Sequence, residues 1–336
     1  MKKLGLMAVV LSMLAGQATA GQGEVNIYSY RQPFLIEPIT DAFTQETGIE
    51  VNIFYSKKGI VEKLTREGQY SPADVVLTSD FNRLLEVTEK GLTQANKDVE
   101  LVEAIPTQYR DNDAHWFALT TRARAMYVSK ERVDDQQALS YEQLASDRFK
   151  GRVCIRSGKH PYNISLIASM IAHHGEKETK TWLTGLKQNL ARKPQGNDRG
   201  QVKAIKEGVC DISLGNSYYF GKMLNNEKQK PWAAAVNLVF PNQEDRGAHI
   251  NISGMAMTKH APNKRQAQQL MAYLSSEKAQ ALYAKMNMEY PVNPAVKPSQ
   301  LVQSWGTFKA DALPLKETVK YRQTAYKLLD EVKFDL

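Results

Sequence analysis

The chain has 336 residues, of which 42% are hydrophobic and 24% are charged, and its formal net charge is +8 at pH 7. A chain of this length and composition can bury the cores of two ordinary domains, which excludes an intrinsically disordered protein. The 44 Lys and Arg residues are scattered among 36 Asp and Glu residues, and no basic block interleaves with aromatics. This pattern argues against nucleic-acid binding and favours a solvated surface of mixed charge.

The first 20 residues have the pattern of a secretory signal peptide. Lys2 and Lys3 precede an apolar run over residues 4–15, and the segment ends in Ala-Thr-Ala. The run is shorter than the roughly 20 residues of a membrane-spanning helix, so we expect cleavage rather than anchoring. No cysteine stands at the cleavage point to carry a lipid. The sequence predicts an exported, soluble protein that begins at Gly21.

Short apolar strands alternate with amphipathic helices in the first part of the mature chain. Strands are expected at 24–30, 49–56 and 73–79, and helices at 34–48, 59–68 and 80–91. This βαβαβα order predicts a mostly parallel sheet with helices on both faces. A long extended run over residues 115–130 then interrupts the pattern.

The alternation starts again after this extended run. Strands are expected at 151–157 and 210–215, helices at 163–175, 179–189 and 199–208, and a second extended run at 248–259 before a helical tail. Two α/β lobes joined by two extended segments describe a hinged, bilobal binding protein. We expect lobe one to comprise residues 22–122 plus 250–300, and lobe two residues 123–249 plus 301–336.

Cys154 and Cys210 are the only two cysteines. In an oxidising compartment an isolated pair favours a disulfide over two free thiols. Both cysteines lie in strand-like runs, and neighbouring parallel strands would bring them within bridging distance. Metal ligation is the weaker alternative, because no C-x-x-C spacing and no nearby histidine accompanies them.

The stretch "GNSYYFGKM", residues 215–223, places two tyrosines directly after a strand. Asn216 or Ser217 is a natural N-cap, which puts Tyr218 and Tyr219 in the first turn of a helix. Tyr162 stands just ahead of a helix expected to begin near Asn163. Ligands of open α/β sheets sit at such strand-to-helix junctions, so we expect the three phenols to converge at the mouth of lobe two.

Phenolate oxygen is a hard anionic ligand that suits a hard, highly charged cation. A free phenol has a pKa of about 10, so three phenols ionise together near neutral pH only beside a strong positive charge. Ferric ion supplies that charge, whereas zinc or manganese sites favour histidine and carboxylate clusters. For each tyrosine, a half-buried aromatic at a lobe surface is the alternative.

These residues carry a family resemblance. The chain resembles the periplasmic ferric-ion-binding proteins, the substrate-binding components of iron ABC transporters, from about Val25 to the C-terminus, through "YSYRQPFLIEPITDAFTQETGI", "GRVCIRSGKHPYNISLIASMIAHHG" and "CDISLGNSYYFGKM". The resemblance implies a type II-like periplasmic-binding-protein fold and ferric ion bound by Tyr162, Tyr218 and Tyr219. It also implies a periplasmic monomer without a membrane anchor that is not an enzyme and that delivers iron to an inner-membrane permease.

The chain departs from the family at one place. Some members have an iron-binding His-Tyr pair after the first strand, where this chain has Gln32-Pro33. It is therefore similar to the subgroup in which a synergistic anion, carbonate or bicarbonate, completes the coordination. Arg31, Gln32 and Arg124 are the expected anion contacts. The alternative for one of Arg122 and Arg124 is a solvated or salt-bridged strand residue.

A hydrolase and a binding protein for another ligand are the alternatives to iron binding. "GNSYY" begins like the G-x-S-x-G elbow of a hydrolase, but its fifth residue is Tyr219, and no His and Asp pair can be assigned to Ser217. A binding protein of the same fold for an organic anion, thiamine or a polyamine is the stronger rival. Ferric phenolate absorbs visible light and an organic-anion complex does not, so colour separates the two.

Overall fold

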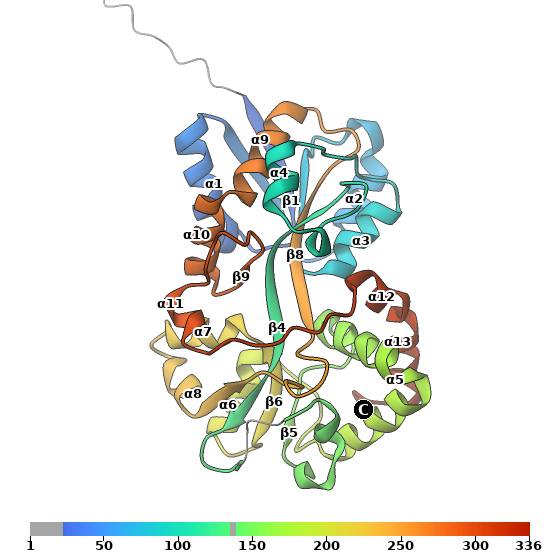
Figure 1. The fold of residues 1–336 in the computed structure, drawn as a ribbon. Coiled ribbons are helices and arrows are strands. Elements are labelled where there is room, and N and C mark those ends of the chain that lie inside the picture. The colour runs from blue at the N-terminus through green and yellow to red at the C-terminus, as the bar shows by residue number, and fades with distance from the viewer. Residues whose placement is uncertain (1–22, 135–138) are drawn as a thin grey trace, which may run out of the picture.

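The computed structural model describes residues 23–134 and 139–336, so the expected signal peptide and Gly21 lie outside the described residues. Two α/β lobes form one elongated molecule, and β4 (Phe117–Ser129) and β8 (Ile250–Met257) run from one lobe into the other (Figure 1). These are the extended segments that the sequence predicts. Among the described residues, no helix is long and apolar enough to cross a membrane.

The upper lobe in Figure 1 contains the first βαβαβα unit and a later helical pair. Its elements are β1 (Glu24–Ser29), α1 (Pro33–Thr47), β2 (Glu50–Tyr55), α2 (Ile60–Glu67), η1 (Gly68–Tyr70), β3 (Val75–Thr78), α3 (Phe81–Glu89), α4 (Val99–Ala104), η2 (Thr107–Tyr109), α9 (Lys264–Ser275), α10 (Glu277–Asn287) and β9 (Tyr290–Pro291). Helix α1 ends as predicted at Gly48, whose φ of 71° favours glycine. The short helices α4 and η2 were not predicted.

The lower lobe contains the second α/β unit and the C-terminal helices. Its elements are η3 (Glu142–Ala145), η4 (Asp147–Phe149), β5 (Val153–Cys154), α5 (Pro161–Gln188), α6 (Asp198–Lys206), β6 (Ile212–Asn216), α7 (Tyr218–Leu224), α8 (Lys230–Ala234), β7 (Val236–Val239), α11 (Gln300–Gln303), α12 (Leu315–Lys320) and α13 (Arg322–Glu331). Helix α5 breaks at Gly175, where φ is 84° and ψ is 171°. This break separates the two helices that the sequence predicts.

One sheet passes through both lobes in the order β2-β1-β3-β8-β4-β6-β5, and β7 and β9 pair with β4. The pairs β1–β2, β1–β3 and β5–β6 are parallel, whereas every pair that involves β4 or β8 is antiparallel. The parallel pairing predicted from the first βαβαβα unit is therefore confirmed for β1, β2 and β3, but the sheet as a whole is mixed. The two crossing strands, β4 and β8, are antiparallel to each other. β8 also pairs antiparallel with β3 in the upper lobe, and β4 pairs antiparallel with β6 in the lower lobe.

Each lobe has its own apolar core, and the C-terminal helices connect the two. Ala325 and Leu328 of α13 are buried in the core of the lower lobe, against α5. Leu315 and Val319 of α12 pack against the core of the upper lobe. The limits of the two lobes stay a prediction, because α12 contacts both.

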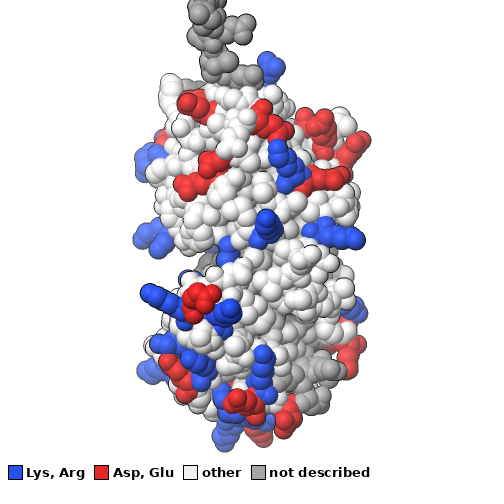
Figure 2. All heavy atoms as spheres, turned by 90° about the vertical axis from the view of Figure 1, so that its left-hand side faces the viewer, with Lys and Arg blue, Asp and Glu red and all other residues white. Residues whose placement is uncertain are grey.

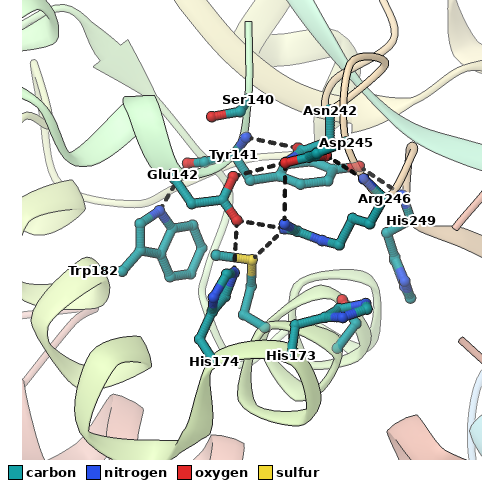
Figure 3. A network of polar contacts seen from close by, with 12 residues as sticks. Ser140, Tyr141, Glu142, His173, His174, Trp182, Asn242, Asp245, Arg246 and His249 are labelled. Atoms are coloured by element: carbon teal, nitrogen blue, oxygen red, sulfur yellow. Dashed lines mark hydrogen bonds and ion pairs between the residues drawn. The ribbon is translucent and has the colours of Figure 1, made fainter.

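A polar network fixes the connection between the lower lobe's helices and the loop before β8 (Figure 3). The carboxylate of Glu142 accepts from Asn242 at 2.8 Å, pairs with Arg246 at 2.5 Å and contacts His174 at 2.8 Å. On the face shown in Figure 2, basic and acidic side chains are interspersed over both lobes. This distribution agrees with the mixed surface expected from the sequence.

Candidate functional site

The tyrosine pair lies where a buried strand turns into a helix, as the sequence predicts. β6 ends at Asn216 and α7 begins at Tyr218, so both rings project from the first helical turn. The N–H of Ser217 donates to the carbonyl of Ala123 at 3.0 Å, and its hydroxyl accepts from the N–H of Ala123 at 3.3 Å. Ser217 occupies the N-cap position of α7, as predicted, but its side chain is bound to β4 and makes no capping bond.

The strand that leads to the tyrosines, β6, is held on both sides. A Cβ atom at Gly215 would lie 2.0 Å from the ring of Tyr127 on β4, so only glycine allows this approach. The hydroxyl of Tyr127 donates to the carbonyl of Asn216 at 2.7 Å. On the other side, the predicted disulfide between Cys154 and Cys210 is present and joins β5 to the start of β6. The end of β6 is therefore fixed in place.

Tyr162 lies at the other junction of the lower lobe, at the start of α5. The helix begins at Pro161, so Tyr162 is in its first turn rather than ahead of it. The Nδ1 atom of His160 accepts from the N–H of Tyr162 at 3.3 Å and caps the helix. The side-chain amide of Asn163 donates to the Ser157 carbonyl at 3.0 Å, which ties the preceding loop to the helix.

The three phenols converge, as expected. The hydroxyls of Tyr162 and Tyr218 are 3.4 Å apart, and the ring centroids of Tyr218 and Tyr219 are 4.2 Å apart. All three side chains are half-buried. Two helix starts from distant parts of the chain thus bring three hydroxyl-bearing rings to one place.

The surroundings of Tyr218 and Tyr219 oppose the ionisation of their phenols. Burial, followed by the neighbouring hydroxyls of Tyr162 and Tyr219, raises the pKa of Tyr218 well above its ordinary value. Burial, Tyr162 and the carboxylate of Asp198 raise the pKa of Tyr219. Burial and Arg156 lower the pKa of His160 to about 3, so its imidazole is neutral. Ionising Tyr218 and Tyr219 near pH 7 requires an added positive charge.

Guanidinium groups surround the tyrosines. The Cζ atoms of Arg122, Arg124 and Arg156 lie 5.9, 5.9 and 5.4 Å from the ring centroid of Tyr162. Arg199 lies 5.7 Å from the ring centroid of Tyr219. The site therefore has a positively charged wall, which disfavours a bare cation and favours an anion or a metal ion already neutralised by its ligands.

Arg124, one of the expected anion contacts, is already fully engaged through its terminal nitrogens. Nη1 donates to Asp198 at 2.8 Å and to Asn216 at 3.1 Å, and Nη2 donates to Asn163 at 2.7 Å. Its Nε atom has no hydrogen-bond partner in the described part of the chain. Arg124 is thus the salt-bridged strand residue that the sequence left as an alternative.

Arg31 and Gln32 follow β1 in the upper lobe. Arg31 is buried and donates through Nη2 to Glu289 at 2.8 Å, and this carboxylate raises the pKa of the guanidinium although burial opposes it. Its Nε has no partner among the described residues. Gln32 is exposed at the N-cap position of α1, where its side chain makes no capping bond. An anion role for either residue stays a prediction.

Arg122 is the site residue that sequence reasoning did not select. Its side chain is 2% exposed, and Nη2 donates to the carbonyl of Ser79. Within the described residues, Nε and Nη1 have no partner. Buried donors are almost always hydrogen-bonded, so a buried guanidinium with two unpartnered nitrogens needs an explanation. The "RAR" spacing puts Arg122 and Arg124 on one face of β4, but it does not tell which of them is left with unpaired nitrogens.

A cleft of about 180 Å³ opens between the lobes. It is lined from the upper lobe by Tyr30, Lys58, Gly59, Glu62, Asp80, Asn82, Arg83 and Glu86, and from the lower lobe by Pro161, Arg322 and Tyr326. Pro161 precedes Tyr162 in the chain, but the three tyrosines themselves do not line this cleft.

The described residues contain no group of three or more His, Cys, Asp or Glu side chains that could hold a metal ion. Phenolate donors suit a trivalent cation better than zinc or manganese.

The chain was compared with known proteins. Residues 39–310 match the family of bacterial extracellular solute-binding proteins. The chain belongs to this family. A relative, iron uptake protein A1 of Synechocystis sp., is 41% identical over 313 residues, which cover 92% of this chain and 87% of the relative.

Solved structures resemble this member of the family closely. The apo ferric ion-binding protein A of Pasteurella haemolytica has a TM-score of 0.90 and 54% identity, covering 93% of this chain and 98% of that one. A Trichodesmium protein in complex with iron and citrate ligands has a TM-score of 0.87 and 38% identity, covering 93% and 100%. These similarities confirm the bilobal periplasmic-binding-protein fold.

Proposed function

We propose that this protein binds ferric ion in the periplasm through the phenolates of Tyr162, Tyr218 and Tyr219, and delivers it to an inner-membrane ABC permease. The observation that carries the proposal is the convergence of the three phenols, with hydroxyls of Tyr162 and Tyr218 3.4 Å apart, at a site without another metal-ligating cluster in the described residues. The relatives named for iron uptake and ferric ion binding support the same cargo.

The charges of this cargo and its ligands balance. Three phenolates neutralise the three positive charges of ferric ion, and each must lose its proton on binding. Because the pKa values of Tyr218 and Tyr219 are raised, iron binding releases protons and weakens as the pH falls. A protein that uses phenolates thus holds iron near neutral pH and releases it more readily in acid.

A synergistic anion fits the donors that surround the phenols. Carbonate or bicarbonate would fill ferric positions that three phenolates leave open, and the free Nε and Nη1 of Arg122 are matched to such an anion. Arg31 and Arg124 each have a free Nε, and Gln32 offers a neutral amide. We propose Arg122 as the main anion contact and retain Arg31, Gln32 and Arg124 as weaker ones.

In this proposal the protein is a transport component and not an enzyme. It is exported by its N-terminal signal peptide, acts as a soluble monomer and binds neither nucleic acid nor a membrane. Its macromolecular partner is the permease of an iron ABC transporter.

Visible absorption of the purified protein tests the proposal. Adding ferric ion should produce a phenolate-to-iron band, and Tyr218→Phe or Tyr219→Phe should abolish or shift it and weaken iron binding. Tyr326→Phe is the matched control, since Tyr326 lines the interlobe cleft but lies outside the tyrosine cluster. If no band develops, or if both variants keep the wild-type band and affinity, iron is not bound by these phenols and an organic anion becomes the better ligand.

A further inference from the structure

Asp198 is a carboxylate buried among the guanidiniums that face Tyr162. It is fully buried at the first position of α6. Its Oδ2 atom accepts from Arg124 at 2.8 Å and from the backbone N–H of Asn216 at 3.0 Å, and its Oδ1 atom accepts from Arg156 at 3.0 Å. One carboxylate therefore binds two guanidiniums and the end of the strand that leads to the tyrosine pair.

The charge of Asp198 persists in this setting. Burial alone would raise the pKa of its carboxyl, but Arg124 and Arg156 hold the pKa below its ordinary value. Its negative charge is also felt at Tyr219, whose pKa it helps to raise. Asp198 is thus an ionised group close to the phenols that does not itself face the ligand.

The charge balance around Tyr162 depends on this residue. Arg122, Arg124 and Arg156 contribute three positive charges to the wall, and Asp198 removes one of them. The buried pair of Arg31 and Glu289 adds no net charge, and Arg199 lies half-buried at the edge of the site, where solvent screens it. The wall over Tyr162 is left with two excess positive charges.

We propose that Asp198 sets the charge of the anion that accompanies the metal. Its carboxylate lowers the net charge of Arg122, Arg124 and Arg156 from +3 to +2, which a dianion neutralises. This inference rests on the proposed function, in which ferric ion and three phenolates are together neutral and the anion alone must be balanced by the wall. With Asp198 ionised, a dianion such as carbonate is matched. Without its charge, the wall has three excess charges and favours a trianion.

The test measures iron affinity with two anions of different charge. Ferric ion is titrated into the protein in carbonate buffer and in citrate buffer, and the ratio of the two affinities is compared between variants. Asp198→Asn should shift this ratio toward citrate by about tenfold. Citrate has one more negative charge than carbonate, and the variant no longer repels that charge from a distance of about 10 Å at an effective dielectric constant of about 20. Arg156→Gln removes a positive charge and should shift the ratio toward carbonate by a similar factor.

The chain supplies a matched control at the other end of β6. Asp211 also bridges two arginines, Arg132 at 2.5 Å and Arg152 at 2.6 Å, but these face away from the tyrosine cluster toward the turn after β4. Asp211→Asn and Arg132→Gln repeat the same chemical changes there and should leave the ratio unchanged.

The outcomes separate this inference from the function on which it rests. If the wild-type protein develops no visible band with either anion, the proposed function fails first. If the band forms but Asp198→Asn and Arg156→Gln leave the ratio within about threefold of wild type, or shift it in the same direction, Asp198 only supports the fold. If Asp198→Asn does not fold, Arg156→Gln, at the accessible end of the cluster, decides the question alone.

Discussion

The disulfide between Cys154 and Cys210 should contribute a large part of the stability of the lower lobe. The cross-link joins residues separated by 56 positions, and it ties β5 to the start of the strand that leads to Tyr218. In the chain-entropy model, closing a loop of about 56 residues removes roughly 14 cal/mol/K from the unfolded chain, or about 4 kcal/mol at 25 °C. Replacing both cysteines with alanine should lower the free energy of unfolding by about this amount.

Urea unfolding of the wild-type protein and the double-alanine variant measures this loss. Both sulfurs are buried, so some of the loss could come from packing rather than from the cross-link. The dependence of the unfolding free energy on urea separates the two, because an uncrosslinked chain exposes more surface when it unfolds and gives a steeper slope. A loss below about 1 kcal/mol with an unchanged slope would refute the loop-entropy reasoning.

Two further predictions concern charged side chains. Burial would raise the pKa of Glu142, but the hydrogen bond from Asn242 and the charge of Arg246 lower it to about 2. The stabilisation that ionised Glu142 gives the folded state is therefore present above about pH 4.5 and is lost as the pH falls toward 2. Glu142→Gln should reduce the difference in unfolding free energy between pH 7 and pH 3 by about 1 kcal/mol, a value lowered to allow for the partial exposure of this side chain. Arg122→Gln should weaken iron binding by about 100-fold in carbonate buffer, because it removes two charge-assisted hydrogen bonds to the anion. The loss should be much smaller in carbonate-depleted buffer. Arg31→Gln, which removes one free N–H, should show about a tenfold loss. If iron affinity falls equally in both buffers, these arginines do not bind the anion.

Local sequence signals predicted most of the fold and the position of the phenols. Gly48 ends α1 and Gly175 divides α5 because their positive φ angles favour glycine, and both glycines follow apolar periodic runs in the sequence. The placement of Tyr218 and Tyr219 in a first helical turn followed from a buried strand that ends in a glycine and two polar residues. Each of these features depends on neighbours within a few positions of the chain.

The mixed sheet could not be predicted in the same way. Alternating strands and helices favour parallel neighbours, and this holds for β1, β2 and β3 and for β5 and β6. The direction of the two crossing strands relative to these neighbours depends on how the chain enters one lobe and returns to the other. Nothing in the residues of β4 or β8 specifies that direction, because both strands are buried on both faces along their whole length.

The arginines show the same limit at the scale of single side chains. Arg122 and Arg124 are two positions apart on one strand, so the sequence places both on the same face and gives no reason to prefer one of them. Arg124 pairs with Asp198, 74 positions away in the chain, whereas Arg122 donates to the carbonyl of Ser79 and, among the described residues, its Nε and Nη1 have no partner. Likewise, Arg31 is engaged by Glu289, 258 positions away. Long-range pairing with carboxylates therefore decides which guanidinium is left with unpaired nitrogens, and only the folded structure contains that information.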